Sequence, residues 1–221
     1  MGNRRFVVFT GLWPEGAGTE ALPEAEAEDF IVCADGGYAV CAAAGLRPDA
    51  VIGDFDSLTS DQIAAIQSAG IESVVHSSEK DDTDTMLCVR YGLARGFSRF
   101  LIAGGIGGDF GHTMANLQTL SFLADMGCEA DIAMDKERLF MTDGEAVLHG
   151  APGAKFSVFS YTDRCFGVYI KNARYPLSDA VLTHSYPIGI HNEFINEEPA
   201  TVSVRGGRLL IVSDMPCTGR L

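Results

Sequence analysis

The sequence predicts an α/β protein with an N-terminal, mostly parallel sheet flanked by helices and a C-terminal all-β sandwich domain. In the N-terminal part, short β-branched runs alternate with longer helical patterns, which is typical of a parallel sheet covered by helices. From about Glu129 the pattern changes to short strand-like runs separated by Gly, Pro, Asn and Asp, which is typical of a sandwich or small barrel. We place the boundary near residue 140, which gives domains of residues 1–140 and 141–221.

In the N-terminal domain, strands and helices are expected in alternation. The expected strands are Phe6–Phe9, Phe30–Ala34, Ala50–Ile52, Ser73–His76 and Phe100–Ala103. The expected helices are Tyr38–Ala44, Asp61–Ala69, one that Asp82 or Thr83 caps and that runs to about Ala94, and Thr113–Met126. Each helix is followed by a glycine that can end it in a left-handed conformation.

The C-terminal domain shows strand-like runs and no helical pattern of comparable length. These runs are Val147–Leu148, Lys155–Ser160, Gly167–Ile170, Ala180–Thr183, Thr201–Val204 and Arg208–Val212. Short strands punctuated by turn residues predict a domain built from antiparallel sheets.

Composition narrows the functional classes. The chain has 221 residues and a formal net charge of −14, so its surface should repel nucleic acids and anionic lipids. The six cysteines are dispersed without a CxxC pair, which favours a reduced, intracellular setting over a disulfide framework. Arg4 and Arg5 precede an apolar run that stops at Thr10, so a first strand is favoured over a signal peptide. No run is long enough to cross a bilayer, and we expect a cytoplasmic enzyme.

The most informative motifs lie where strands of the predicted parallel sheet end. In such sheets ligands bind beyond the carboxyl ends of the strands. At these ends the sequence places Asp35, Asp54, Asp56, Lys80–Asp84 and Gly104–Gly108. We therefore expect these segments to converge on one site.

Asp54 and Asp56 flank Phe55. In an extended segment both carboxylates would point to the same side and could share a cation. Carboxylates packed closely raise each other's pKa unless a cation lies between them, and hard oxygen ligands suit Mg²⁺. A simpler interpretation is an Asx turn after a strand, with Ser57 assisting.

A second acidic run follows at Lys80–Asp84. We place Asp81, Asp82 and Asp84 in the first turn of a helix, where the helix dipole favours negative charge. Lys80, the cation of the run, could neutralise a transferred phosphoryl group. Its alternative role is to pair with the neighbouring acids.

Glycines follow two other strands. Gly36 and Gly37 allow either close approach to a ligand or a tight strand-to-helix turn. The Gly104–Gly108 run, with Gly105, Gly107 and Gly108, precedes a helix and suits a phosphate or nucleoside cradle, although it is not a Walker A loop. His112 could cap that helix, contact a phosphate or face solvent. No Ser-His-Asp or Cys-His set is indicated by the spacing.

A longer set of segments carries a family resemblance. It comprises Ala34–Gly37, Pro48–Ser57, Lys80–Asp84, Gly104–Gly108 with His112 and Asn116, Ala173–Leu177, Asn192–Phe194 and Ala200–Ser203. Together these segments resemble thiamine pyrophosphokinase, in order and over nearly the whole chain. The spacing of GDFDS and KDDTD is the most specific part of the resemblance.

The resemblance implies a homodimer with thiamine bound between chains, and transfer of a diphosphate from ATP to the thiamine hydroxyl. It implies that Asp54, Asp56 and Asp84 hold Mg²⁺ and act in catalysis with Lys80, with Asp35 close by. On the nucleotide side it implies the residues Asp35, Gly36, Gly37, Thr83, Gly105, Gly107, Gly108, His112 and Asn116. On the thiamine side it implies His191, Asn192 and Phe194, with Phe194 as a flat surface for the cationic ring.

Two positions depart from the family pattern. Where the family has Gly-Gly-Arg-x-Asp-His, this chain has Gly107-Gly108-Asp109-Phe110-Gly111-His112, so an arginine that should meet the nucleotide is an aspartate. Where a serine is expected before Asn192, the chain has His191. Three rival functions therefore stay open: a pyrophosphokinase for another primary alcohol such as a pterin or thiamine analogue, a metal-dependent phosphohydrolase, and a nucleotide- or thiamine-sensing protein without turnover.

Overall fold

The structure is a computed structural model that describes residues 4–13, 26, 28–79 and 81–214. It divides the chain into two compact units, Met1–Asp135 and Lys136–Leu221. The predicted boundary near residue 140 lies a few residues beyond Asp135, inside the strand Glu137–Thr142 of the second unit. The fold is mixed α/β, as the sequence predicts.

Unit 1 alternates strands with helices. Its strands are β1 (Phe6–Phe9), β2 (Phe30–Ala34), β3 (Ala50–Gly53), β4 (Glu72–Val75), β5 (Arg99–Ala103) and β6 (Glu129–Ala133). Its helices are α1 (Gly37–Ala43), α2 (Ser60–Ser68), α3 (Asp84–Ala94) and α4 (Phe110–Asp125). Most bounds lie within one or two residues of those predicted from the sequence.

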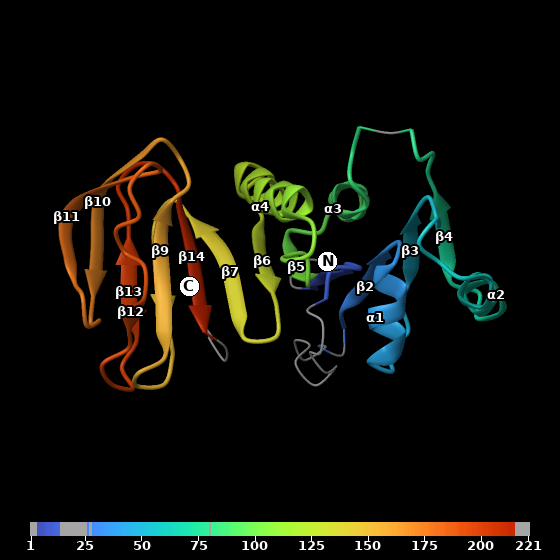
Figure 1. Cartoon of the computed structure of the whole chain (residues 1–221), viewed down its shortest axis with the longest axis horizontal. Helices are drawn as coiled ribbons and strands as arrows, with labels where there is room; N and C mark the ends of the chain where they lie inside the picture. The colour runs from blue at the N-terminus through green and yellow to red at the C-terminus, as the bar shows by residue number, and fades with distance from the viewer. Residues whose placement is uncertain (1–3, 14–25, 27, 80, 215–221) are drawn as a thin grey trace. The chain divides into compact units, whose positions relative to one another are not determined.

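The strands of unit 1 follow the order β6-β5-β1-β2-β3-β4, and every neighbouring pair is parallel. Helices α1 and α2 lie on one side of this sheet and α3 and α4 on the other (Figure 1). Strands β1 and β3 are buried at every position, because helices cover both faces. All carboxyl ends of these parallel strands therefore meet at one edge of the sheet.

Each face of the sheet has its own core. On the α1–α2 face, alternate strand residues such as Val7, Cys33 and Val51 pack with Tyr38 of α1 and Ile66 of α2. On the other face, the ring of Phe6 lies 5.7 Å from that of Phe30, in a stacked pair, and contacts the rings of Phe97, Phe100 and Tyr91. The alternation of strand residues thus fixes which helix covers which face.

Two strands near the junction were not predicted. Glu129–Ala133 is the sixth parallel strand, paired with β5 in the register Phe100↔Ala130 and Ile102↔Ile132. The sequence EADIA holds one β-branched residue, so its local pattern is weak, and the neighbouring strand decides its conformation. Strand β7 (Glu137–Thr142) was also missed.

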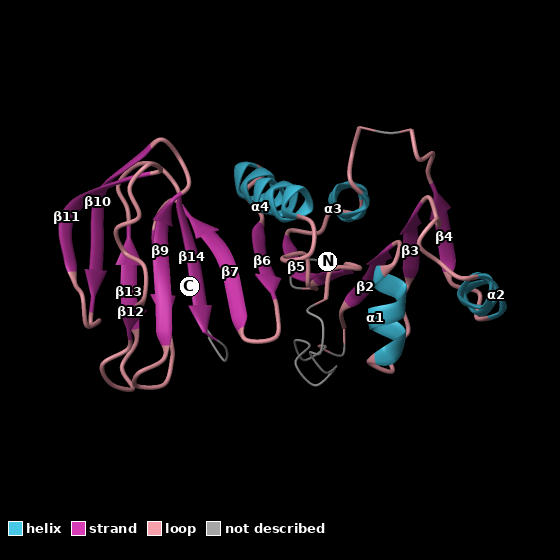
Figure 2. Cartoon of the chain, in the orientation of Figure 1, coloured by secondary structure: helices cyan, strands magenta, loops and turns pink. Residues whose placement is uncertain are grey.

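Unit 2 is built from strands alone within the part of the chain that the structure describes (Figure 2). These are β7, β8 (Glu145–Leu148), β9 (Lys155–Ser160), β10 (Arg164–Lys171), β11 (Leu177–Thr183), β12 (Asn192–Glu193), β13 (Ala200–Ser203) and β14 (Leu209–Asp214). One antiparallel set has the order β12-β9-β14-β7, and the other has the order β11-β10-β13-β8.

The two antiparallel sets of unit 2 share one hydrophobic core. Val158 and Ile211 come from the first set, and Ile170 and Val202 from the second, and all belong to a single buried cluster. Such a shared core is how two sheets stabilise one another.

No helix in the described ranges is both long and apolar enough to span a membrane.

We expect Gly37→Ala to destabilise unit 1. An ideal Cβ at Gly37 would lie 2.0 Å from the carbonyl oxygen of Phe9, so α1 would have to move away from β1. Overpacking against backbone should lower the free energy of unfolding by at least about 2 kcal/mol, measured by chemical denaturation. Gly144→Ala is the control, because a Cβ there meets nothing within 4 Å. Equal stability of the two variants would contradict the close packing of α1 on β1.

Candidate active site

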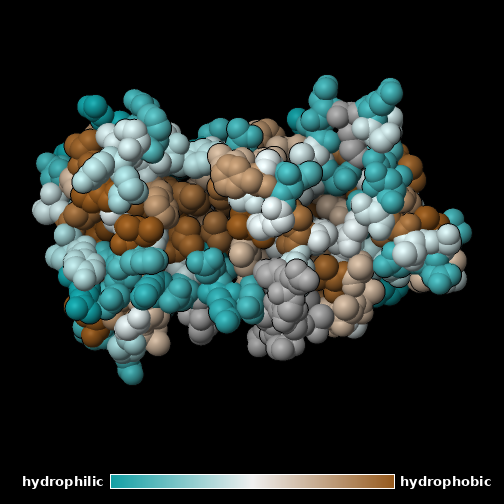
Figure 3. Space-filling model, viewed as in Figure 1, coloured by the Kyte–Doolittle hydropathy of each residue, from teal (hydrophilic) through white to brown (hydrophobic). Residues whose placement is uncertain are grey.

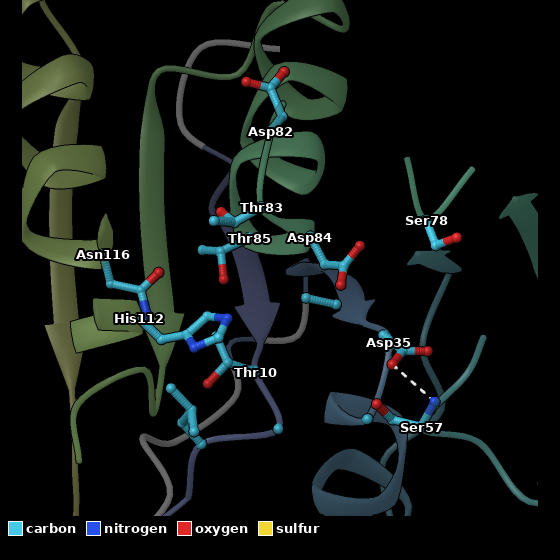
Figure 4. Close-up of a pocket in the computed structure, with 14 residues that line it drawn as sticks. Thr10, Asp35, Ser57, Ser78, Asp82, Thr83, Asp84, Thr85, His112 and Asn116 are labelled. Carbon is cyan, nitrogen blue, oxygen red and sulfur yellow. Dashed lines mark hydrogen bonds between the residues drawn. The ribbon is translucent and has the colours of Figure 1, made fainter. Parts of the chain in front are cut away.

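A pocket of about 480 Å³ opens within unit 1 at the carboxyl edge of the parallel sheet (Figure 4). Its walls come from the segments that follow β1, β2 and β3, from the segment that leads into α3, and from the first turns of α3 and α4. The lining residues are Thr10, Gly11, Leu12, Ala34, Asp35, Gly36, Ser57, Ser78, Asp82, Thr83, Asp84, Thr85, His112 and Asn116. The convergence expected from the sheet topology is therefore present.

Three carboxylates lie close together beside this pocket, and two of them, Asp35 and Asp84, line it. Asp35 follows β2, Asp54 follows β3 and Asp84 begins α3, and one carboxylate oxygen of each lies within 4.8 Å of the others. Asp35 is buried, and Asp54 and Asp84 are half-buried. Strand pairing brings the first two together, because Ala34 and Ile52 are partners in adjacent parallel strands.

Asp35 is the most constrained of the three acids. Its backbone has φ 42°, and its Oδ2 accepts a hydrogen bond from the N–H of Ser57 at 3.3 Å. Its Oδ1 is buried and has no hydrogen-bond partner among the described residues. Gly53 leaves room for it, since an ideal Cβ at Gly53 would lie 2.8 Å from the Asp35 Cβ.

These observations fit a divalent cation. A buried carboxylate oxygen without a partner costs free energy, and a second and third carboxylate nearby add repulsion. A cation with hard oxygen ligands, such as Mg²⁺, relieves both costs at once. Asp35, Asp54 and Asp84 are therefore the residues that could hold it.

The conformation of the segment around Asp56 differs from the predicted one. Phe55 has φ 66°, so the segment is not extended and the two flanking carboxylates do not share one side as expected. Asp54 Oδ1 instead accepts a hydrogen bond from the N–H of Asp56 at 3.3 Å, as in an Asx turn, and Asp56 Oδ1 accepts one from the Ser57 hydroxyl. Asp35 takes the place in the acid cluster that the sequence assigned to Asp56.

The structure also corrects the prediction for the second acidic run, Lys80–Asp84. Helix α3 begins at Asp84 with Thr83 as its N-cap, whose hydroxyl accepts from the N–H of Met86 at 3.2 Å. Asp81 and Asp82 precede the helix, and Asp82 pairs with Arg90 at 2.7 Å. Only Asp84 lies in the first turn and meets the other acids. Lys80 lies outside the described residues.

The glycines at the strand ends serve two purposes. Gly36 lines the pocket, whereas Gly37 permits α1 to pack on β1. In the loop before α4, Gly105, Gly107 and Gly108 have φ of 92°, 103° and 61°, which an L-residue rarely adopts. These three glycines are not among the residues that line the pocket. The helix that follows them, α4, contributes His112 and Asn116 to its wall.

Asn116 and Thr113 of α4 hold the glycine loop. The buried Asn116 amide donates to the carbonyl of Gly105 at 2.7 Å, and the Thr113 hydroxyl accepts from the N–H of Gly107 at 3.0 Å. Asn116 thus has a structural contact as well as its place in the pocket wall.

Asp109 caps α4, which starts at Phe110 and not at Thr113 as predicted. Its Oδ1 accepts from the backbone N–H of His112 at 2.9 Å and contacts the ring Nδ1 of His112 at 3.1 Å. These hydrogen bonds, the backbone one above all, lower the pKa of Asp109. The preference of aspartate for helix N-caps is the one sequence signal that could have indicated this role.

The predicted thiamine-side residues lie in unit 2, in and beside β12. Phe194 is 2% exposed, and its ring packs against Phe156 at 5.0 Å in the core, so it offers no open face for stacking, contrary to the prediction. The buried Asn192 amide accepts from the N–H of Tyr175 at 2.9 Å and donates to the Tyr175 carbonyl at 2.8 Å. His191 is exposed, with φ 55°.

Comparison with known proteins agrees with this geometry. Residues 23–130 match the family model described as "Thiamin pyrophosphokinase, catalytic domain". A thiamine pyrophosphokinase of Bacillus subtilis (strain 168) is 26% identical over 175 residues, which cover 76% of this chain and 79% of that protein. The family model and this relative support membership of the thiamine pyrophosphokinase family.

Solved thiamine pyrophosphokinase structures share the fold. The crystal structure from Bacillus subtilis has a TM-score of 0.82 at 20% identity and covers 96% of this chain and 99% of its own. The crystal structure from Geobacillus thermodenitrificans has a TM-score of 0.80 at 23% identity and covers 97% of this chain and 100% of its own. The segment that matches the catalytic domain, residues 23–130, contains Asp35, Asp54 and Asp84.

We expect Mg²⁺ to stabilise this protein through the acid cluster. At ten times its Kd, Mg²⁺ should add about 1.4 kcal/mol to the free energy of unfolding, seen as a rise in melting temperature. Asp35→Asn should lose this rise, because the amide keeps the contact with Ser57 but removes a charged ligand. Asp61→Asn, at an exposed acid of α2, is the control. An undiminished rise in Asp35→Asn would contradict the site.

We expect Asn192→Ala to destabilise unit 2. The change leaves the N–H groups of Tyr175 and Glu193 and the carbonyl of Tyr175 without their amide partner. Loss of these contacts should cost about 2–3 kcal/mol in the free energy of unfolding, measured by chemical denaturation. The matched control is Asn196→Ala, which removes an exposed amide. If both variants unfold alike, Asn192 does not hold the Tyr175 segment.

Proposed function

We propose that this protein is a magnesium-dependent thiamine diphosphokinase that transfers a diphosphate from ATP to the hydroxyl of thiamine, giving AMP and thiamine diphosphate. The observation that carries the proposal is the cluster of Asp35, Asp54 and Asp84, with its buried and unpartnered Asp35 Oδ1, in a pocket at the sheet edge. The family match covers the same segment. Residues 1–140 would bind ATP and Mg²⁺, and residues 141–221 would contribute to the thiamine site.

The residues of the pocket suit a polyphosphate. Asp35, Asp54 and Asp84 would hold Mg²⁺, which when bound supplies positive charge to phosphate oxygens and to the AMP leaving group. Ser78 lines the same pocket, and its hydroxyl can donate to a phosphate oxygen.

The acceptor and the assembly are also proposals. Unit 2 exposes large hydrophobic side chains, and hydrophobic surface is visible over this unit in Figure 3. These are Phe166, Tyr175, Val181, Tyr186, Ile188, Ile190 and Ile195. Exposed apolar surface of this kind supports a homodimer with thiamine bound at the subunit interface. Because Phe194 is buried, exposed side chains near His191 are better placed to meet thiamine than the Phe194 ring.

Product identification tests the proposed reaction. The protein is incubated with ATP, Mg²⁺ and thiamine, and products are separated by chromatography. Equal amounts of AMP and thiamine diphosphate are expected. Free phosphate without a thiamine product would indicate a phosphohydrolase, and retained binding without turnover would indicate a sensor. AMP formation only with another primary alcohol, such as a hydroxymethyl pterin, would reassign the acceptor.

Variants of the acid cluster test the roles of its members. Asp54→Asn and Asp84→Asn should each lower kcat by at least about 100-fold, because each removes a ligand of the ion that stabilises the leaving group. Asp56→Asn should lower it much less, since Asp56 contacts Ser57 and lies outside the cluster. Circular dichroism checks that each variant is folded. Turnover near the wild-type value in Asp84→Asn would refute the assignment of that ligand.

A further inference from the structure

We propose that Asp109 is a positioning residue that orients the imidazole of His112 toward the phosphate groups of the bound nucleotide. The inference rests on the proposed function, and it concerns a position where this chain departs from the family pattern. The simpler alternative is that Asp109, which stands where the family has an arginine, only repels ATP.

The geometry that links the two residues is a pair of contacts from one oxygen. Asp109 Oδ1 accepts from the backbone N–H of His112 at 2.9 Å and contacts its Nδ1 at 3.1 Å. One carboxylate therefore contacts both the backbone at the start of α4 and the His112 ring. A doubly protonated imidazole has two N–H donors, and the contact with Asp109 uses the one on Nδ1. The donor on Nε2 remains for a ligand oxygen.

The charge of the described pocket residues favours such a donor. Among the described lining residues, the ionisable side chains are Asp35, Asp82, Asp84 and His112, so His112 is the one that can be positive. His112 extends from α4 on the side of the pocket opposite Asp35 and Asp84 (Figure 4). A metal on the acids would neutralise one part of a triphosphate, and His112 is placed to meet another part.

An arginine at position 109 would meet an anion differently. A guanidinium can contact phosphate directly, but it cannot accept the hydrogen bond from the His112 N–H, so it cannot cap α4 in the way Asp109 does. In this chain the positive charge would be carried by His112, and Asp109 would hold it. The side chains of both residues are largely exposed, at 67% for Asp109 and 63% for His112, so the pair is weak until a ligand binds.

The two interpretations of Asp109 predict opposite changes in nucleotide affinity. Asp109→Ser keeps a good N-cap but removes the charge and cannot reach the ring. If Asp109 only repels ATP, this variant should bind MgATP more tightly. If Asp109 positions His112, its Kd for MgATP should rise about fivefold, the scale of an exposed charged contact. Asp109→Asn, which retains an acceptor oxygen in the same place, should recover most of the affinity.

A double-mutant cycle then separates positioning from a general effect on α4. His112→Gln should weaken MgATP binding, and Asp109→Ser should add almost nothing in that background, because the ring it holds is gone. The measurement is equilibrium titration of the full-length chain with MgATP, alongside thermal unfolding to check that α4 remains formed. Additive effects of the two changes, or tighter binding by Asp109→Ser, would overturn the proposal.

Direct binding also separates this inference from the proposed reaction. A wild-type protein that binds MgATP but forms no thiamine diphosphate would refute the diphosphokinase activity and leave the Asp109–His112 coupling measurable. An active enzyme in which the two changes are additive would refute only the positioning role. If the wild-type enzyme forms thiamine diphosphate, Asp109→Ser should raise the KM for ATP. The KM for thiamine should stay near the wild-type value.

Discussion

Mutual repulsion among Asp35, Asp54 and Asp84 is the constraint on which the site depends. Their carboxylate oxygens lie within 4.8 Å of one another, and one oxygen of Asp35 is buried without a partner. Without a cation between them, such acids repel one another. Here two follow adjacent parallel strands and the third begins a helix, so the backbone holds them together. The sheet and helix hold the three carboxylates close together, and a divalent cation can relieve the repulsion between them.

The rest of unit 1 supports that arrangement. Gly53 leaves space that any side chain would take from Asp35, and the Ser57 N–H orients one of its oxygens. Thr83 caps α3 and so fixes where Asp84 starts the helix. Asn116 and Asp109 organise the opposite wall, one by holding the glycine loop and the other by capping α4. Catalytic geometry in this fold is thus set by strand ends and helix starts, where backbone and side-chain hydrogen bonds meet.

Unit 2 shows that residues in a segment that carries a resemblance can also serve the stability of their own domain. Asn192 and Phe194 belong to the β-rich half that resembles the family, yet one amide is used to hold Tyr175 and one ring fills the core. Polar and aromatic residues in a small β-domain are often recruited for its own stability, because few other side chains can fill the core or satisfy buried backbone groups. Exposure, which the sequence does not reveal, decides between the two uses.

The sequence by itself determined the alternation of strands and helices in unit 1, the ends of most elements and the segments that form the site, because these follow from local periodicity, caps and glycine stops. It did not determine β6, whose weak pattern becomes a strand only beside β5. Nor did it determine that Asp35 replaces Asp56 among the clustered acids. That choice depends on the left-handed turn at Phe55 and on the pairing of β2 with β3, which join residues distant in the chain. Local sequence fixes what each segment can form, whereas the distances between carboxylates exist only once the sheet is assembled.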